Sequence, residues 1–162
     1  MTYSFQPMDE VHARAILGWR YDPPYTFYNV APEDVDAALP GLLDPNWAYF
    51  SMHDERAELV GFCCFGEDAR VPGGDYSVPA LDIGWGMRPD LTGQGRGVAF
   101  LDAILDFARR TYTAEFFRIT VAAFNTRSRR LCENLLFRHV QDFVHSGTGT
   151  EFVILIRSAR VG

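Results

Sequence analysis

Hydrophobic residues recur along the chain at two different spacings, and the switching between them predicts a mixed α/β domain. Between residues 80 and 87, hydrophobic residues alternate with polar or small ones, which predicts a strand. Between residues 98 and 109, hydrophobic residues recur every three or four positions, which predicts an amphipathic helix. A glycine-rich segment at residues 92–97 joins these two elements.

The rest of the chain follows the same two patterns, with proline, glycine or charged residues at the turns. Strands are predicted at residues 3–6, 47–53, 59–65, 117–123, 138–145 and 151–156. Helices are predicted after Asp9, from Pro32 to near Gly41, and at residues 126–136. Gly84 and Gly86 predict a bulge or a close backbone approach within the strand at 80–87. The predicted order is β-αα-βββ-α-β-α-ββ.

Length and composition indicate one globular domain over residues 1–162. The chain has 162 residues, of which 48% are hydrophobic and 22% charged, values typical of a folded protein too short for two ordinary domains. Its formal net charge of −6 provides no basic patch that could follow a phosphate backbone, so we expect no nucleic-acid partner. An amine substrate suits this charge better.

Cysteine usage and the N-terminus indicate the compartment. Cys63, Cys64 and Cys132 have the spacing of neither a disulfide framework nor a zinc site, so we expect reduced thiols and no metal. The first residues lack the basic start and apolar run of a secretion signal, and no stretch approaches the roughly 18 apolar residues of a membrane span. We therefore expect a cytoplasmic protein with no membrane partner. A homodimer is compatible with the sequence.

The segment at residues 92–97, here called the glycine turn, carries the clearest chemical signal. Gly93, Gly95 and Gly97 occupy alternate positions between the predicted strand and helix. Such a turn can expose successive backbone N–H groups and present a helix N-terminus to an anion, which suits a pyrophosphate. The alternatives are a flexible surface loop and a nucleotide phosphate loop, although the latter lacks its Lys-Ser/Thr ending.

This segment resembles the coenzyme A motif of the GNAT acetyltransferase superfamily, which is Arg or Gln, two residues, Gly, one residue, then Gly or Ala. Alignment on the flanking proline and helix puts Thr92, Gly95 and Gly97 at the three motif positions. A shift by two residues uses Gln94, Gly97 and Ala99 instead. We prefer the first alignment, in which Thr92 replaces the usual Arg or Gln.

A second match begins at Asn125, which precedes an arginine-rich helix as in the GNAT segment after the fifth strand. Asn125 can cap this helix and reach the pantetheine, and Arg127 and Arg130 can approach the phosphates. Either arginine taken singly can instead belong to a solvated helix face. Where this chain has Cys132 and Leu136, the GNAT pattern commonly has Tyr and Gly. In the family that Tyr protonates the departing thiolate, so Cys132 is a candidate acid, and water or another residue is the alternative.

The resemblance covers nearly the whole chain and implies the GNAT fold, a central mixed sheet flanked by helices. It also implies acetyl-CoA as co-substrate and direct transfer of its acetyl group, in a ternary complex, to a primary amine of a small molecule or peptide. The implied cofactor-binding residues are Met87, Thr92, Gly93, Gln94, Gly95, Arg96, Gly97, Val98, Asn125, Arg127 and Arg130. A catalytically silent acyl-CoA sensor or scaffold is the alternative function.

A carboxylate is expected near the acetyl group, because an alkylammonium with a pKa near 10 must lose a proton before it can attack. Asp82 stands seven residues before Pro89, where GNAT enzymes often carry a catalytic Glu, and is the candidate base. The alternative is a structural acid on a sheet face. Glu67 and Asp68 are further candidate acids.

Residues 19–30, here called the aromatic loop, fall between the first two predicted helices, which in GNAT folds often line the acceptor pocket. The candidate substrate-binding residues are Trp19, Tyr21, Tyr25 and Tyr28. With Asp22 nearby, their rings can hold a cation or a flat apolar substrate. The alternative is that they pack the helices onto the sheet.

Overall fold

Strands and helices follow one another in the predicted order in a computed structural model, which describes residues 2–161. The strands are β1 Ser4–Pro7, β2 Tyr49–His53, β3 Leu59–Phe65, β4 Leu81–Met87, β5 Phe116–Ala122, β6 Arg138–Val144 and β7 Glu151–Ser158. The helices are α1 Glu10–Leu17, α2 Val35–Leu43, α3 Gly97–Thr111 and α4 Thr126–Asn134. The hydrogen-bonded strand order is β1-β2-β3-β4-β5-β7-β6. The predicted fold class, a mixed sheet with helices, is therefore confirmed.

The sheet is mixed because one pair of strands runs parallel. β4 and β5 are parallel, whereas β1 with β2, β2 with β3, β5 with β7 and β6 with β7 are antiparallel. The chain divides into two compact units, which are described separately below. The first contains the chain up to Cys64 together with Trp85–Gly97, and the second contains Phe65–Gly84 together with the chain from Val98 onward.

In the first unit, α1 and α2 pack together through a small apolar cluster. Ala13, Leu17 and Leu39 are its buried members. Asp9 caps α1 as predicted, since its side chain accepts a hydrogen bond of 2.9 Å from the backbone N–H of His12. α2 continues to Leu43, past its predicted end, because its last leucines pack against this cluster.

The β2–β3 hairpin begins later than the hydrophobic pattern predicts. A 3-10 turn occupies Pro45–Trp47, and Ala48 takes a left-handed conformation with φ of 49°, so β2 starts at Tyr49. Gly86 of β4 makes the predicted close approach. A Cβ added there would lie 2.3 Å from the ring of Phe62 in β3. The ring therefore lies directly over the glycine.

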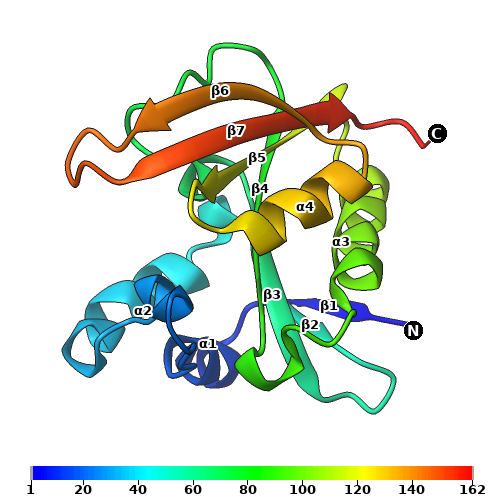
Figure 1. Ribbon diagram of the computed structural model, residues 1–162. Helices are drawn as coiled ribbons and strands as arrows, with labels where there is room; N and C mark the ends of the chain where they lie inside the picture. The colour runs from blue at the N-terminus through cyan, green and yellow to red at the C-terminus, as the bar shows by residue number, and fades with distance from the viewer. Residues whose placement is uncertain (1, 162) are drawn as a thin grey trace. The chain divides into compact units, whose positions relative to one another are not determined.

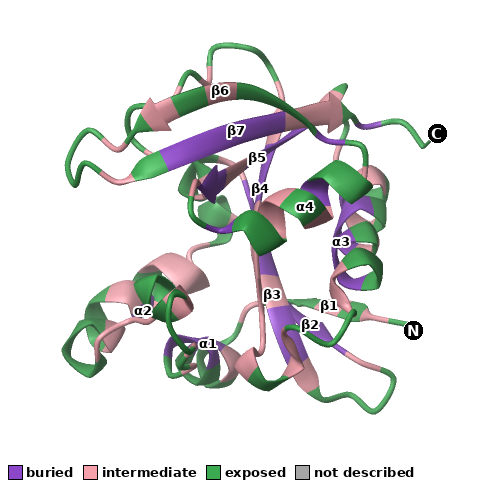
Figure 2. Ribbon diagram, viewed as in Figure 1, coloured by how far each residue is buried: buried purple, intermediate pink, exposed green. Residues whose placement is uncertain are grey.

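In the second unit, β7 forms the centre of a three-stranded antiparallel arrangement with β5 and β6 (Figure 1). Its middle is buried, whereas the edge strand β6 is largely exposed (Figure 2). α3 buries the apolar face that its spacing predicts, which consists of Leu101, Ile104, Leu105 and Ala108, and it buries Phe100 as well. α4 ends at Asn134, before its predicted end, and Leu136 then adopts a left-handed conformation with φ of 71°.

Candidate active site

The glycine turn adopts the backbone conformation that anion binding requires. Gly93 and Gly95 are left-handed, with φ of 72° and 73°, and α3 begins at Gly97. Alternation of left-handed and ordinary residues turns successive N–H groups toward one side of the backbone. The turn can therefore present several N–H donors to a phosphate group, and only glycine takes this conformation without a steric cost.

Two side chains of the glycine turn fasten it to the 3-10 turn at Pro89–Leu91. Thr92 Oγ1 donates to the carbonyl oxygen of Pro89 at 2.7 Å, and Gln94 Nε2 donates to that of Asp90 at 2.7 Å. Thr92 and Gln94 thus support the backbone of the turn. Direct contact of Thr92 and Gln94 with a cofactor stays a prediction. The cofactor contacts of Arg96, Gly97 and the exposed Val98 are also predictions.

Arg88 holds the end of β4 that leads into the turn. Its Nε and Nη2 donate to the carboxylate of Asp90 at 2.7 and 3.2 Å, and its Nη1 donates to the carbonyl oxygen of Leu59 at 2.8 Å. The hydrogen bonds between the two charged groups raise the pKa of Arg88 and lower the pKa of Asp90. The ion pair therefore persists at neutral pH, and it holds the turn in a defined position.

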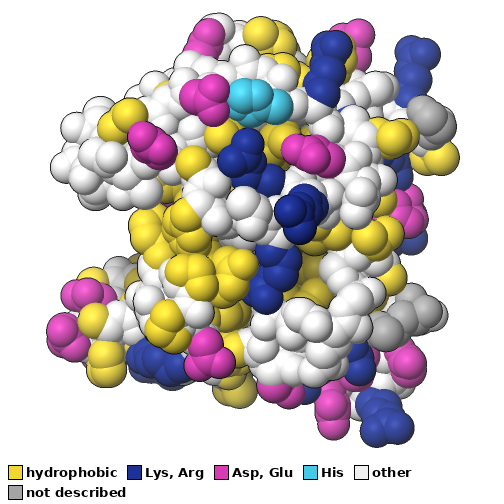
Figure 3. All heavy atoms as spheres, viewed as in Figure 1, with side chains coloured by type: hydrophobic (Ala, Val, Ile, Leu, Met, Phe, Trp, Pro, Cys, Tyr) yellow, Lys and Arg dark blue, Asp and Glu magenta, His cyan; other side chains and the backbone are white. Residues whose placement is uncertain are grey.

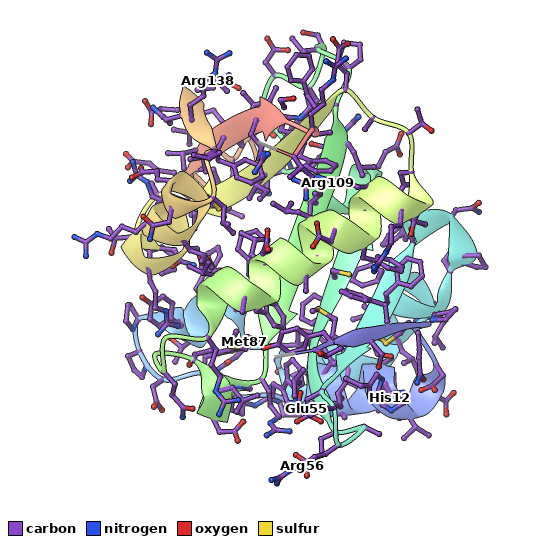
Figure 4. The ribbon with its side chains drawn as sticks, turned by 90° about the vertical axis from the view of Figure 1, so that its right-hand side faces the viewer. His12, Glu55, Arg56, Met87, Arg109 and Arg138 are labelled. Atoms are coloured by element: carbon purple, nitrogen blue, oxygen red, sulfur yellow. The ribbon has the colours of Figure 1, made fainter. Side chains whose placement is uncertain are left out.

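The aromatic loop is anchored to the end of β4. Tyr21 Oη donates to the backbone carbonyl oxygen of Met87 at 2.6 Å. Met87 is the last residue of β4 and is labelled in Figure 4. Trp19 lies with its ring centroid 6.3 Å from that of Phe62. The structure thus brings predicted substrate-binding and cofactor-binding positions together within the first unit.

The other predicted aromatic residues lie on a short 3-10 turn at Tyr25–Tyr28. Tyr25 is partly buried, whereas Tyr28 is 40% exposed beside the 48% exposed Phe27, their centroids being 5.0 Å apart. Hydrophobic side chains are visible at and above the area that α1 and α2 occupy in this view (Figure 3). Large exposed rings on a loop can contact a substrate. Substrate binding by Tyr25 and Tyr28 remains a prediction.

Asp82 lies in the second unit and is held by two arginines. Its Oδ1 and Oδ2 accept bonds of 2.6 and 2.8 Å from Arg118, and Oδ2 accepts a further bond of 2.8 Å from Arg70. Asp82 and Arg118 are register partners on the parallel strands β4 and β5, which explains this fork-to-fork geometry. The side chains of Asp82 and Arg118 are both 2% exposed.

These contacts weigh against Asp82 as the catalytic base. Both carboxylate oxygens already accept bonds from charged donors, and burial keeps a substrate ammonium away from them. A structural acid, the alternative reading of the sequence, fits the geometry better. The catalytic role of Asp82 stays a prediction that a substitution can test. The other candidate acids, Glu67 and Asp68, lie exposed on a 3-10 turn.

A tyrosine that the sequence pattern did not single out, Tyr76, contacts both arginines around Asp82. The ring of Tyr76 lies 4.9 Å from the guanidinium carbon of Arg118 and 5.3 Å from that of Arg70. Its hydroxyl bonds to Thr120 at 2.8 Å and accepts from the backbone N–H of Val71 at 2.9 Å. The one available signal was Arg118, a charged residue within the apolar strand β5.

The predicted cofactor residues of the second unit lie on α4. Asn125 caps this helix as predicted, since its Oδ1 accepts from the backbone N–H of Ser128 at 3.0 Å. Arg127 and Arg130 are exposed, and arginine side chains gather over α4 in the space-filling view (Figure 3). Their contacts with coenzyme A remain predictions.

Cys132 faces the interior from α4 and has no exposed surface. Burial raises the pKa of its thiol from the ordinary 9.0 to about 12, with the nearby carboxylate of Glu133 adding to the effect. A thiol with this pKa and no access to solvent is a poor proton donor to a departing thiolate. This favours water as the acid. The left-handed Leu136 explains the Gly that the family pattern has at this position, since glycine adopts φ of 71° freely.

We expect Cys132→Ala to change turnover only severalfold and to lower the free energy of unfolding by about 1 kcal/mol near pH 8. The unfolded thiol ionises near pH 9, whereas the folded thiol stays neutral up to about 12. Wild-type stability therefore falls as pH rises through this interval, and the variant lacks this contribution. Denaturant unfolding near pH 8 and pH 11 should show the stability advantage of the wild type over the variant shrinking with pH and reversing in sign at the higher pH.

A large loss of turnover in Cys132→Ala, with folding and acetyl-CoA affinity intact, would make the cysteine catalytic. A difference in unfolding free energy that is the same at both pH values would contradict the burial of a neutral thiol.

The remaining cysteines and acids form no further centre in the part of the chain that the structure describes. Cys63 and Cys64 are buried in β3, and burial raises the pKa of Cys63 well above its ordinary value. Among residues 2–161, no group of three or more His, Cys, Asp or Glu side chains is arranged to hold a metal ion. Within the same residues, no helix has both the length and the apolar character to cross a bilayer.

A family match covers most of the chain. The family model described as "Acetyltransferase (GNAT) domain" matches residues 4–138, a range that contains the glycine turn, Asp82 and α4. The chain belongs to the GNAT acetyltransferase family. This GNAT acetyltransferase therefore has the family and the fold that its sequence motifs predict. No curated protein matches it in sequence.

Solved structures share the GNAT fold at low sequence identity. The yncA structure from Salmonella typhimurium, with its cofactor acetyl-CoA, has a TM-score of 0.66 and 18% identity, covering 100% of this chain and 96% of that one. A spermidine N-acetyltransferase SpeG chimera from Vibrio cholerae and hSSAT has a TM-score of 0.70 and 16% identity, covering 98% and 97%. The aminoglycoside N(6′)-acetyltransferase from Legionella pneumophila has a TM-score of 0.71 and 16% identity, covering 97% and 92%.

Acetyl-CoA is the typical co-substrate of this family, and the residues of the GNAT acetyltransferase fit it. The glycine turn leaves open space at Gly95, where an added Cβ would meet no atom within 4 Å. An open, left-handed glycine next to a helix N-terminus suits the approach of a phosphate group to the backbone. The chemistry that acetyl-CoA supplies is an activated acetyl thioester.

Proposed function

We propose that this GNAT acetyltransferase transfers the acetyl group of acetyl-CoA directly to a primary amine in a ternary complex. The amine nitrogen attacks the thioester carbonyl carbon, a C–N bond forms, and the C–S bond breaks with its electron pair leaving on sulfur. The amine loses a proton and the thiolate gains one, so the products are an acetamide and free coenzyme A. Positioning of the two reactants supplies most of the acceleration.

The observation that carries this proposal is the conformation of the glycine turn. Two left-handed glycines at alternate positions, followed by the first residue of α3, form a backbone surface suited to a pyrophosphate. The N–H groups from Gly93 to Gly97 would hold this group, and the backbone of β4 near Met87 would face the pantetheine. The proton of the amine would leave through water, because both carboxylate oxygens of Asp82 already accept hydrogen bonds from Arg118.

The acceptor is proposed to be an amine that carries further positive charge. Between Tyr21 and Trp47 the chain contains acidic residues and neither arginine nor lysine. The acids are Asp22, Glu33, Asp34, Asp36 and Asp44. Acidic and aromatic side chains together attract organic cations. Two structural neighbours are named for spermidine and aminoglycosides, which supports a polycationic small molecule over a neutral amine.

The compartment proposed for this reaction is the cytoplasm. In the described residues no disulfide joins Cys63, Cys64 and Cys132, and each of them is buried. Three thiols in so small a protein suit a reducing environment. Transfer of an acetyl group from a thioester to an amine is not a redox reaction, so it is compatible with such an environment.

Isothermal calorimetry tests the cofactor part of this proposal. We expect acetyl-CoA to bind, ATP to compete poorly, and acetyl-CoA at a hundred times its dissociation constant to stabilise the protein by about 2.7 kcal/mol. The native state gains this free energy because the unfolded chain has no glycine turn in place. Denaturant unfolding with and without acetyl-CoA measures it.

Two results would contradict the proposal. Binding of ATP in preference to acetyl-CoA would indicate a nucleotide phosphate loop instead. Binding of acetyl-CoA without turnover of any amine in a broad panel would indicate a silent acyl-CoA sensor or scaffold.

A further inference from the structure

We propose that Tyr21 is a positioning residue that couples the aromatic loop to the cofactor-binding end of β4, an inference that rests on the proposed function. Its hydroxyl donates to the carbonyl oxygen of Met87 at 2.6 Å. Met87 is the last residue of β4, and Arg88 and the 3-10 turn follow it directly before the glycine turn. One hydrogen bond therefore connects the acceptor side of the first unit to the strand end that precedes the cofactor turn.

The loop carrying Tyr21 is closed on itself by Asn29. Asn29 Oδ1 accepts from the backbone N–H of Tyr21 at 2.7 Å, and Asn29 Nδ2 donates to the carbonyl oxygen of Tyr21 at 3.3 Å. Within this closure, the N–H of Tyr25 donates to the carbonyl oxygen of Asp22 at 2.8 Å. Because Tyr21 makes both the closure and the strand contact, the closed loop follows any movement of the end of β4.

The contact of Trp19 with β3 gives this loop a fixed base. The ring centroid of Trp19 lies 6.3 Å from that of Phe62 on β3. The ring centroid of Tyr49, on β2, lies 6.2 Å from the same Phe62 ring. Phe62 in turn lies over Gly86, the residue before Met87, and a side chain at Gly86 would displace it. The base of the loop and its hydroxyl anchor thus meet β3 and β4 at adjacent positions.

This arrangement predicts that the loop responds to acetyl-CoA. A cofactor that binds along the end of β4 restrains Met87, and the Tyr21 hydroxyl passes this restraint to the loop that would hold the amine. Coupling of this kind is reciprocal, so ordering of the loop favours the bound cofactor in return. Loss of the hydroxyl should break the coupling while leaving the cofactor turn itself in place.

Hydrogen exchange of the full chain, with and without saturating acetyl-CoA, tests this inference. In the wild type we expect acetyl-CoA to slow exchange in peptides covering residues 92–100 and also in those covering 19–30. In Tyr21→Phe we expect residues 92–100 to be protected as before, whereas the protection of residues 19–30 falls by roughly three- to tenfold, as the loss of one hydrogen bond predicts.

Tyr112→Phe is the matched control, since it removes a tyrosine hydroxyl just beyond α3, and it should keep both responses. Asn29→Ala opens the same loop without touching the hydroxyl, so it should also lose the response at residues 19–30. Full loop protection in Tyr21→Phe, or in Asn29→Ala if the first variant folds poorly, would overturn the inference. Absence of protection at residues 92–100 in the wild type would overturn the proposed cofactor site as well.

Discussion

Replacing Gly95 by glutamate should weaken acetyl-CoA binding by about a hundredfold, which corresponds to about 2.7 kcal/mol. Gly95 has φ of 73°, and any other residue in this conformation costs about 1–2 kcal/mol. The new side chain also occupies the open space through which a phosphate would approach, and its charge repels that phosphate. Calorimetric titration of the variant with acetyl-CoA measures the loss.

Gly149→Glu is a matched control for this prediction. Gly149 also has a left-handed conformation, with φ of 77°, and an added Cβ there meets no atom within 4 Å. The β6–β7 turn that contains it has no proposed role in binding, so this variant should pay the same backbone strain and bind acetyl-CoA like the wild type. Wild-type affinity in Gly95→Glu would show that the glycine turn is not the cofactor site.

Replacing Arg118 by methionine should lower the free energy of unfolding by about 3 kcal/mol. Methionine keeps an apolar stem but leaves the carboxylate of Asp82 buried with Arg70 as its remaining charged partner. A buried carboxylate that loses two of its three charged hydrogen bonds costs more than the ion pair contributes, so the loss is larger than a surface salt bridge would give. Urea unfolding of the two proteins measures the difference.

Arg70→Met is the comparison variant, because the Arg70 side chain is 38% exposed and provides a single bond to Asp82. It should cost about 1 kcal/mol. Asp82→Asn separates structure from catalysis. As a structural acid, Asp82 predicts lower stability with turnover largely retained over about pH 6 to 9. A normal stability combined with a loss of turnover would instead restore Asp82 as the base.

Local patterns predicted the order of the elements because each element carries its own spacing and its own caps. Asp9 is a clear case, since a polar residue directly before an apolar helix spacing caps that helix, whereas the cap at Asn125 was predicted from the family resemblance. The predicted start of β2 was wrong for an equally local reason. The 3-10 turn at Pro45–Trp47 and the left-handed Ala48 occupy the first two positions of the segment predicted as a strand.

The glycine turn was predictable because its requirement lies in the backbone. Only glycine takes a left-handed conformation freely, so Gly93 and Gly95 record the conformation in the sequence itself. The same reasoning explains Leu136, where the family pattern has glycine and this chain adopts the same φ sign at a cost.

Contacts between distant residues could not be read in the same way. Asp82 and Arg118 are 36 positions apart, and Tyr21 and Met87 are 66 apart. An acid in a strand is equally compatible with a base and with an ion pair until its partner is known. The hydroxyl of Tyr21 gave no indication that it bonds to the backbone of β4, because backbone acceptors leave no trace in side-chain patterns.

Transfer of an isotopically labelled acetyl group from acetyl-CoA to an amine would establish this protein as an N-acetyltransferase. The enzyme would be incubated with labelled acetyl-CoA and a panel of polyamines, aminoglycosides and peptides, and the products analysed by mass spectrometry. We expect the label to appear on the nitrogen of at least one polycationic amine, with an equal amount of free coenzyme A released. Coenzyme A release without any labelled amine, or no turnover with any acceptor, would contradict the proposed function.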